Sequence, residues 1–169
     1  MIATLKSPSD ALYVIKPGVP IKHWSFITLH HTGNVPLGVP LLGEWIDALH
    51  RNGGREGYDP FANGMGYHFL VNTGGEIEYG DRWYLQLPGG HNNSLDKNGI
   101  SRNHSSIGVC MAGNFSKSIP TTEQLSATRR LIASLGKPVR PHFLYKETEC
   151  PGKIYDGTRN WLQTWEEPC

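Results

Sequence analysis

The segment "ITLHHTG", residues 27–33, places two adjacent histidines between a run of apolar and β-branched residues and a glycine. Together with the preceding phenylalanine, the segment "FITLHH", residues 26–31, has an uninterrupted run of apolar and β-branched residues before the histidines. A strand that is covered by the rest of the fold has this composition, because its apolar residues need not alternate with polar ones. We therefore predict a buried central strand that ends at the two histidines.

The two histidines of this strand point in opposite directions. Successive side chains alternate between the faces of a strand, so His30 shares a face with Thr28, whereas His31 shares the other face with Ile27 and Leu29. A regular strand therefore cannot present both histidines to one metal ion. We expect His31 to point toward the packed side and to be hydrogen-bonded there. Thr28 makes the face of His30 the more polar one, so the alternation favours His30 as the site residue. Phe26 lies on the same face, so the alternation alone does not decide the choice.

Patterns on both sides of the strand predict three more strands and three helices. Apolar residues at three- and four-residue steps indicate helices that bury one face, and a Gly-Gly turn between two apolar runs indicates a hairpin. We expect strands over 67–72, 73–80 and 105–113, and helices over 40–53, 121–136 and 154–165. Interleaved strands and helices predict an α/β fold with a central mixed β-sheet flanked by helices on both faces.

The composition fits an enzyme with a single domain, residues 1–169. The 20 glycines and 12 prolines favour a loop-rich α/β or α+β fold over a helical bundle. Lysine and arginine total 16 against 15 acidic residues, so no nucleic acid is expected as a partner. The three cysteines are few and odd in number, which argues against a disulfide framework. A cysteine is therefore available to bind a metal ion.

Membrane and export signals are not evident in the sequence. No apolar run approaches the roughly 18 residues of a membrane span, and residues 1–20 lack a continuous apolar stretch before a small-residue cleavage site. We therefore expect a chain that is made in the cytoplasm without a Sec signal and that has no membrane partner.

A second segment, "RPHFLYKETECPGK" at residues 140–153, carries further candidate metal ligands. His142 and Cys150 stand eight positions apart among prolines and a glycine, which indicates a loop that can present both side chains to one ion. Neutral imidazole and thiolate are both good zinc ligands, and a third ligand would come from His30 or His31. Three protein ligands leave a fourth position for water, as in catalytic rather than structural zinc sites.

Five blocks of the sequence, in this order, resemble the zinc-dependent type 2 N-acetylmuramoyl-L-alanine amidases. This family includes amidase-type phage lysozymes and animal peptidoglycan recognition proteins, and the resemblance spans about residues 25–165. The blocks are "ITLHHTG", "GMGYHFLVN", "PGGHNNS", "SSIGVCMAGNF" and "PHFLYKETECPG". The resemblance implies a mixed sheet with flanking helices, a Zn²⁺ cofactor at one end of a groove, and peptidoglycan as substrate. The bond cleaved would be the amide between the lactyl group of N-acetylmuramic acid and L-alanine of the stem peptide.

The resemblance also assigns roles to residues of this chain. The metal ligands fall on His30, His142 and Cys150, and Tyr67 falls on the tyrosine beside the metal-bound water. Thr148, two positions before the cysteine, matches catalytic recognition proteins, whereas some phage enzymes have a lysine there.

Substrate contacts are predicted at two positions. His91, in "GGHNNS", matches a family histidine near the groove. Trp83, in a polar loop bounded by glycines, is a candidate for stacking on glycan, whereas Trp45 and Trp161 lie on apolar helix faces and are expected to pack in the core. Cys110, in an apolar strand, is also expected in the core.

Tyr67 and Thr148 are expected to act on the transition state. Tyr67 would orient the attacking water or donate to the oxyanion, and Thr148 would add a hydrogen bond to the same oxygen. Neither is a strong base, so the general base stays open, with Glu147 and Glu149 as candidates by adjacency alone.

Three functions remain open from the sequence. The first is an amidase of the endolysin or autolysin type, acting on the cell wall as a monomer. The second is a module that recognises muropeptides without cutting them, against which Cys150 and Tyr67 argue. The third is a zinc hydrolase that acts on another amide.

Overall fold

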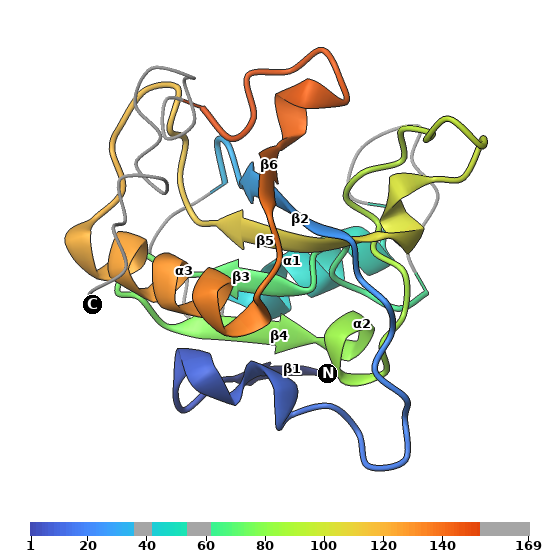
Figure 1. The fold of residues 1–169 in the computed structure, drawn as a ribbon. Helices are drawn as coiled ribbons and strands as arrows, with labels where there is room; N and C mark the ends of the chain where they lie inside the picture. The colour runs from blue at the N-terminus through green and yellow to red at the C-terminus, as the bar shows by residue number, and fades with distance from the viewer. Residues whose placement is uncertain (36–41, 54–61, 153–169) are drawn as a thin grey trace, which may run out of the picture.

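The computed structural model describes residues 1–35, 42–53 and 62–152. Within these ranges, six strands form one sheet in the order β1-β4-β3-β5-β2-β6 (Figure 1). The strands are β1 (Ile2–Thr4), β2 (Phe26–His31), β3 (Phe69–Val71), β4 (Ile77–Gly80), β5 (Ser106–Met111) and β6 (Val139–Pro141).

The sheet is mixed, as predicted. β2 runs parallel to both of its neighbours, β5 and β6, and β3 runs parallel to β5. β4 is antiparallel to β3 and to β1, and β3 and β4 form the predicted hairpin. The strand 26–31 therefore lies between two parallel partners, which explains its continuous apolar sequence.

The helices are α1 (Leu42–Arg51), α2 (Asp81–Tyr84) and α3 (Thr122–Leu135), with short 3-10 helices at Pro8–Leu12, Arg102–His104 and His142–Leu144. The ends of α3 follow from its sequence. The Thr121 side chain accepts a hydrogen bond from the Gln124 backbone N–H, and Gly136 ends the helix in the left-handed conformation with φ of 60°. None of the helices in the described ranges is long and apolar enough to cross a membrane.

Helices cover both faces of the sheet, as predicted (Figure 1). α3 contributes Leu131 to the larger core, which also contains Ile27 and Leu29 of β2. α1 packs on the opposite face, where Ile46 lies in a smaller core with Cys110. The prediction that Cys110 is a core residue is therefore confirmed. The side chains of β2 that face α1 are the more polar ones, which leaves this side of the sheet available for a site.

Some elements differ from the sequence-based expectations. β1 and β6 were not expected, because three residues are too few to show a periodic pattern. The segment around Asp81 forms a helical turn, α2, rather than a loop. The helix predicted over 154–165, with Trp161, lies outside the described residues.

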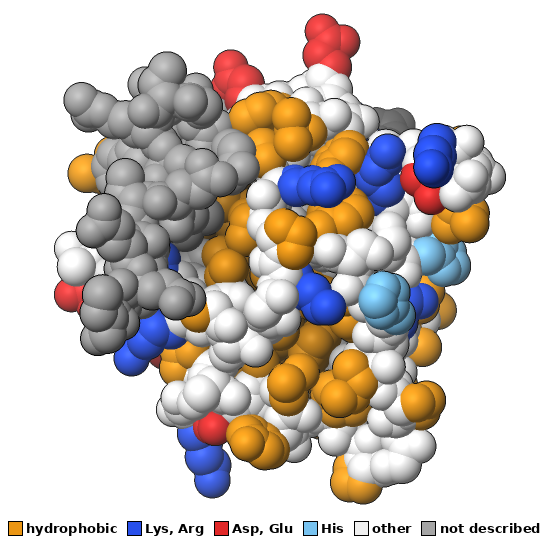
Figure 2. All heavy atoms as spheres, viewed as in Figure 1, with side chains coloured by type: hydrophobic (Ala, Val, Ile, Leu, Met, Phe, Trp, Pro, Cys, Tyr) orange, Lys and Arg blue, Asp and Glu red, His pale blue; other side chains and the backbone are white. Residues whose placement is uncertain are grey.

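The surface agrees with a chain whose charges nearly balance. On the face in Figure 2, lysine and arginine side chains occupy several separate places, some of them beside acidic side chains.

Candidate functional site

The sheet register brings His30 and His142 together. β2 and β6 are parallel neighbours with Leu29 opposite Pro141, so the next residue of each segment lies at the same end of the sheet. His142 begins the 3-10 helix that directly follows β6. The centroids of the His30 and His142 rings lie 4.4 Å apart.

Cys150 reaches the same place through the loop that follows His142. The Phe143 N–H donates to the Cys150 carbonyl oxygen at 3.0 Å, which closes the loop. Cys150 Sγ lies 3.7 Å from His30 Nδ1 and accepts a hydrogen bond from the His31 backbone N–H at 3.4 Å. One ligand atom from each of His30, His142 and Cys150 lies within 4.8 Å of the others.

The ionisation of these groups fits a zinc site. Burial, followed by the neighbouring histidines, holds the pKa of His30 well below its usual value. Burial, with smaller effects of Lys146 and His31, lowers the pKa of His142 to about 4. Both imidazoles are therefore neutral at pH 7 and have a lone pair for a metal. Burial raises the pKa of the Cys150 thiol to about 12, so metal binding must displace its proton. Two imidazoles and a thiolate form a donor set that suits zinc.

A cavity of about 860 Å³ lies over the three candidate ligands. Its volume is in the range of small-molecule sites. Its wall includes Trp45, His50, Tyr67 and several asparagines, and the candidate ligands themselves line it. A substrate in this cavity would therefore have direct access to a metal ion held there.

Tyr67 lies beside the candidate ligands. Its ring centroid is 5.2 Å from that of His30, and its half-buried side chain lines the cavity. His50 of α1 accepts a hydrogen bond from the Gly66 N–H at its Nδ1 atom, at 2.9 Å, and so holds the backbone just before Tyr67. Helical spacing alone places His50 near the end of α1 and gives no signal for this contact.

The segment before Cys150 contributes Thr148 and two glutamates. Thr148 lines the cavity, and its hydroxyl accepts a hydrogen bond from the Cys150 N–H at 3.2 Å. A hydroxyl that accepts one hydrogen bond can still donate another. Glu147 also lines the cavity. Glu149 instead interacts with His31: burial lowers the pKa of His31, and the charge of Glu149 partly offsets this effect. Glu147 is therefore the better placed of the two carboxylates for proton transfer.

His91 lines the same cavity, and its ring is held by protein contacts. It is only 8% exposed, and each of its ring nitrogens faces a protein atom. Nδ1 lies 3.0 Å from His30 Nε2, and Nε2 lies 3.3 Å from the Ser106 carbonyl oxygen. The structure thus adds a contact with His30, and a role of His91 in substrate contact stays a prediction.

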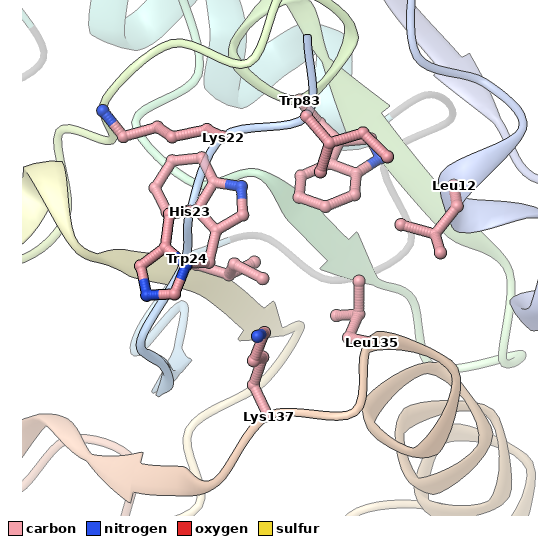
Figure 3. Close-up of a pocket in the computed structure, with 9 residues that line it drawn as sticks. Leu12, Lys22, His23, Trp24, Trp83, Leu135 and Lys137 are labelled. Atoms are coloured by element: carbon pink, nitrogen blue, oxygen red, sulfur yellow. The ribbon is translucent and has the colours of Figure 1, made fainter.

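The prediction that Trp83 stacks on glycan is wrong. Trp83 is 1% exposed, and its indole N–H donates to the Ala11 carbonyl oxygen at 2.6 Å. It borders a separate cavity of about 290 Å³ with Trp24 and Leu135 (Figure 3). The start of α2 turns this side chain inward, an effect that the glycine-bounded sequence does not reveal. Trp45, expected in the core, is half-buried: it packs against the smaller core and also lines the larger cavity.

Buried His68 predicts a pH-dependent stability. It is fully buried beside Trp24, and burial lowers its pKa to about 3. An unfolded histidine has a pKa of about 6.5, so between these two pKa values the unfolded chain binds more protons than the folded chain. The free energy of unfolding therefore decreases as the pH is lowered. We expect this residue alone to cost about 2 kcal/mol between pH 7 and pH 5.

Urea unfolding of the zinc-free protein at both pH values measures this effect. The other buried histidines add to the slope, so the comparison is with His68→Gln, whose free energy of unfolding should change less with pH by that amount. Equal pH dependence of the two proteins would contradict the assignment.

Comparisons with known proteins agree with this fold. A sequence model of the N-acetylmuramoyl-L-alanine amidase family matches residues 20–153. Peptidoglycan-recognition protein SC2 of Drosophila melanogaster is 29% identical over 106 residues, which are 57% of this chain and 53% of that protein. The chain thus spans about half the length of the curated relatives it matches.

Two solved structures illustrate the shared fold. The amidase LysC from Clostridium intestinale URNW is 24% identical with a TM-score of 0.57, covering 81% of this chain and 82% of LysC. A mutant of Drosophila PGRP-LB in complex with tracheal cytotoxin is 18% identical with a TM-score of 0.61, covering 89% of this chain and 88% of that one.

Proposed function

Because this chain belongs to the N-acetylmuramoyl-L-alanine amidase family, we propose that it is a zinc-dependent peptidoglycan amidase. The bond cleaved is the amide between the lactyl group of N-acetylmuramic acid and L-alanine of the stem peptide. The observation that carries the proposal is the convergence of His30, His142 and Cys150, whose ligand atoms lie within 4.8 Å of one another beneath an open cavity. A site with three protein ligands has the open form of catalytic zinc centres.

Each residue of the site has a distinct part in the proposed reaction. Zinc held by His30, His142 and Cys150 supplies a Lewis acid and an acidified water. The Tyr67 phenol donates a hydrogen bond to the carbonyl oxygen of the scissile amide as negative charge develops on it. Thr148 donates a second hydrogen bond to that oxygen while it holds the Cys150 backbone. Glu147, on the cavity wall, is the carboxylate proposed to move a proton toward the leaving amine.

The cavity wall is proposed to bind the muropeptide. The half-buried indole of Trp45 offers an apolar surface for a sugar ring or an alanine methyl group. Side-chain amides of Asn34, Asn93 and Asn114 line the same cavity and supply both donors and acceptors for peptide groups and hydroxyls. The PGRP-LB complex with tracheal cytotoxin supports a muropeptide as the ligand class. We place the activity at the cell wall, as expected of an endolysin or autolysin, with the chain acting as a monomer.

Recognition without cleavage is the second candidate function. The similarity to peptidoglycan-recognition protein SC2 favours it, since that protein is named for recognition. The presence of both a thiol ligand and Tyr67 beside it favours hydrolysis, because binding alone needs neither.

Incubation of zinc-loaded protein with a soluble disaccharide-peptide from peptidoglycan separates these functions. The amidase should release a free disaccharide with an intact lactyl carboxylate and a peptide with an L-alanine amino terminus, both identified by mass spectrometry. Cys150→Ser is the matched control and should yield no products, since a hydroxyl is a poor zinc ligand. Calorimetric binding of the intact muropeptide without products would support recognition, and cleavage at another bond would indicate a different hydrolase.

A further inference from the structure

A line of buried polar contacts connects the candidate metal site to the backbone of β5. It runs from the Ser106 carbonyl oxygen to His91 Nε2, at 3.3 Å, and from His91 Nδ1 to His30 Nε2, at 3.0 Å. We propose that His91 is a positioning residue that fixes the tautomer and orientation of His30 and so presents His30 Nδ1 to the metal. This inference rests on the proposed zinc site.

The Ser106 carbonyl determines where every proton in this line lies. A carbonyl oxygen only accepts, so His91 Nε2 must carry a hydrogen and donate it. In a neutral imidazole the other nitrogen is then an acceptor, so His91 Nδ1 accepts from His30 Nε2–H. His30 Nδ1 is therefore left without a hydrogen, and it is the atom that lies 3.7 Å from Cys150 Sγ. One backbone oxygen thus selects the metal-binding nitrogen of a residue on the neighbouring strand.

Two glycines make room for the His91 ring. A Cβ atom built on Gly108 of β5 would lie 2.4 Å from His91 Cδ2, and one built on Gly89 would lie 2.3 Å from the same atom. These distances are far shorter than any van der Waals contact, so a methyl group at either position must displace the ring. The packing of His91 is therefore specified by its surroundings, as expected of a residue whose orientation matters.

Neighbouring His68 does not compete for His91. The two ring centroids lie 5.6 Å apart, but both nitrogens of His68 have backbone partners. His68 Nδ1 accepts from the Gly108 N–H, and its Nε2 donates to the Leu87 carbonyl oxygen. The partner of His91 is thus His30, and its loss would leave His30 Nε2–H unpaired in a buried place.

Zinc affinity of matched His91 variants tests the proposal. His91→Leu removes the acceptor and should weaken zinc binding on the order of 10- to 100-fold, the usual effect of losing a partner of a metal-bound histidine. His91→Asn keeps an acceptor oxygen near the position of Nδ1 and should restore most of the affinity. Gly108→Ala leaves every ligand and both histidines in the sequence but displaces the ring, so it should weaken binding as well.

A control is needed for a general loss of stability. Thr128→Ala removes a buried hydrogen bond, from Thr128 Oγ1 to the Gln124 carbonyl oxygen, on the opposite face of the sheet. It should lower the melting temperature without changing zinc affinity. Affinities are measured by competition with a chromophoric chelator, and melting temperatures are measured on the zinc-free proteins.

Nitrogen-15 spectra of the histidine rings give a readout that needs no metal. In the zinc-free wild-type protein at a pH where histidines are neutral, His30 should carry its hydrogen on Nε2, and His91→Leu should give a mixture of tautomers. A hydrogen on His30 Nδ1 in the wild type, or unchanged zinc affinity in His91→Leu, would overturn the proposal. A wild-type protein that binds no zinc would instead refute the proposed function, and the spectra would still decide the role of His91.

Discussion

Replacing His30 by alanine is expected to abolish both zinc binding and amide hydrolysis, whereas replacing the adjacent His31 should preserve both. His30 points to the face of the sheet that carries the cavity, with Nδ1 3.7 Å from Cys150 Sγ. His31 points to the other face, where its Nδ1 accepts a hydrogen bond from the Phe115 N–H at 3.1 Å. Without His30 only two protein ligands remain, which is too few for a stable zinc site.

His31→Ala serves as the matched control. Its contact with Cys150 uses the backbone N–H, which alanine retains. The variant leaves the buried Phe115 N–H without its partner, so we expect a loss of about 1–3 kcal/mol in the free energy of unfolding. Zinc content, hydrolysis and urea unfolding of both variants decide the matter. A zinc-loaded His30→Ala beside a metal-free His31→Ala would reverse the assignment.

Tyr67→Phe is expected to keep zinc but to lower kcat on the order of 100-fold or more, the effect of losing one donor to an oxyanion. Tyr67 is not one of the candidate ligands, and its ring packs against the smaller core and lies 5.2 Å from that of His30. Phenylalanine keeps this ring packing and removes only the hydroxyl. The expected change is therefore in the transition state and not in metal retention.

Steady-state kinetics on the soluble muropeptide, with zinc content measured on the same sample, tests this expectation. Tyr13→Phe is a suitable control, because Tyr13 is 86% exposed and does not line the cavity. It should leave kcat unchanged. An unchanged kcat in Tyr67→Phe would remove the phenol from the mechanism, and a loss of zinc would reassign it to a role in the metal site.

The sequence predicted the elements that carry strong local signals. The helix over 121–136 has a capping threonine at its start and a glycine at its end, and the structure places α3 between them. The strand over 26–31 has an uninterrupted apolar pattern and was found as β2. β6 has only three residues, so no periodicity could reveal it. The contact between β2 and β6 places His142 beside His30, whereas the residues alone had left the third ligand open between His30 and His31.

The side-chain contacts that the sequence did not reveal depend on residues that are distant in sequence. The indole of Trp83 is buried because Ala11, 72 positions earlier, supplies its hydrogen-bond acceptor. His91 contacts His30 because the loop before β5 folds over β2, and no local pattern encodes that arrangement. The alternation of side chains along β2, by contrast, is a local property, and from it the sequence correctly predicted that His30 and His31 lie on opposite faces of the sheet.

Titration of the zinc-free protein with zinc, followed by assay of muropeptide hydrolysis at each addition, links the metal site to the reaction. We predict that the release of L-alanine amino termini rises in proportion to bound zinc and stops rising at about one ion per chain, because His30, His142 and Cys150 form one set of ligands. Hydrolysis that is complete without zinc, or a chain fully loaded with zinc that binds the muropeptide and never cleaves this amide, would contradict the proposed function.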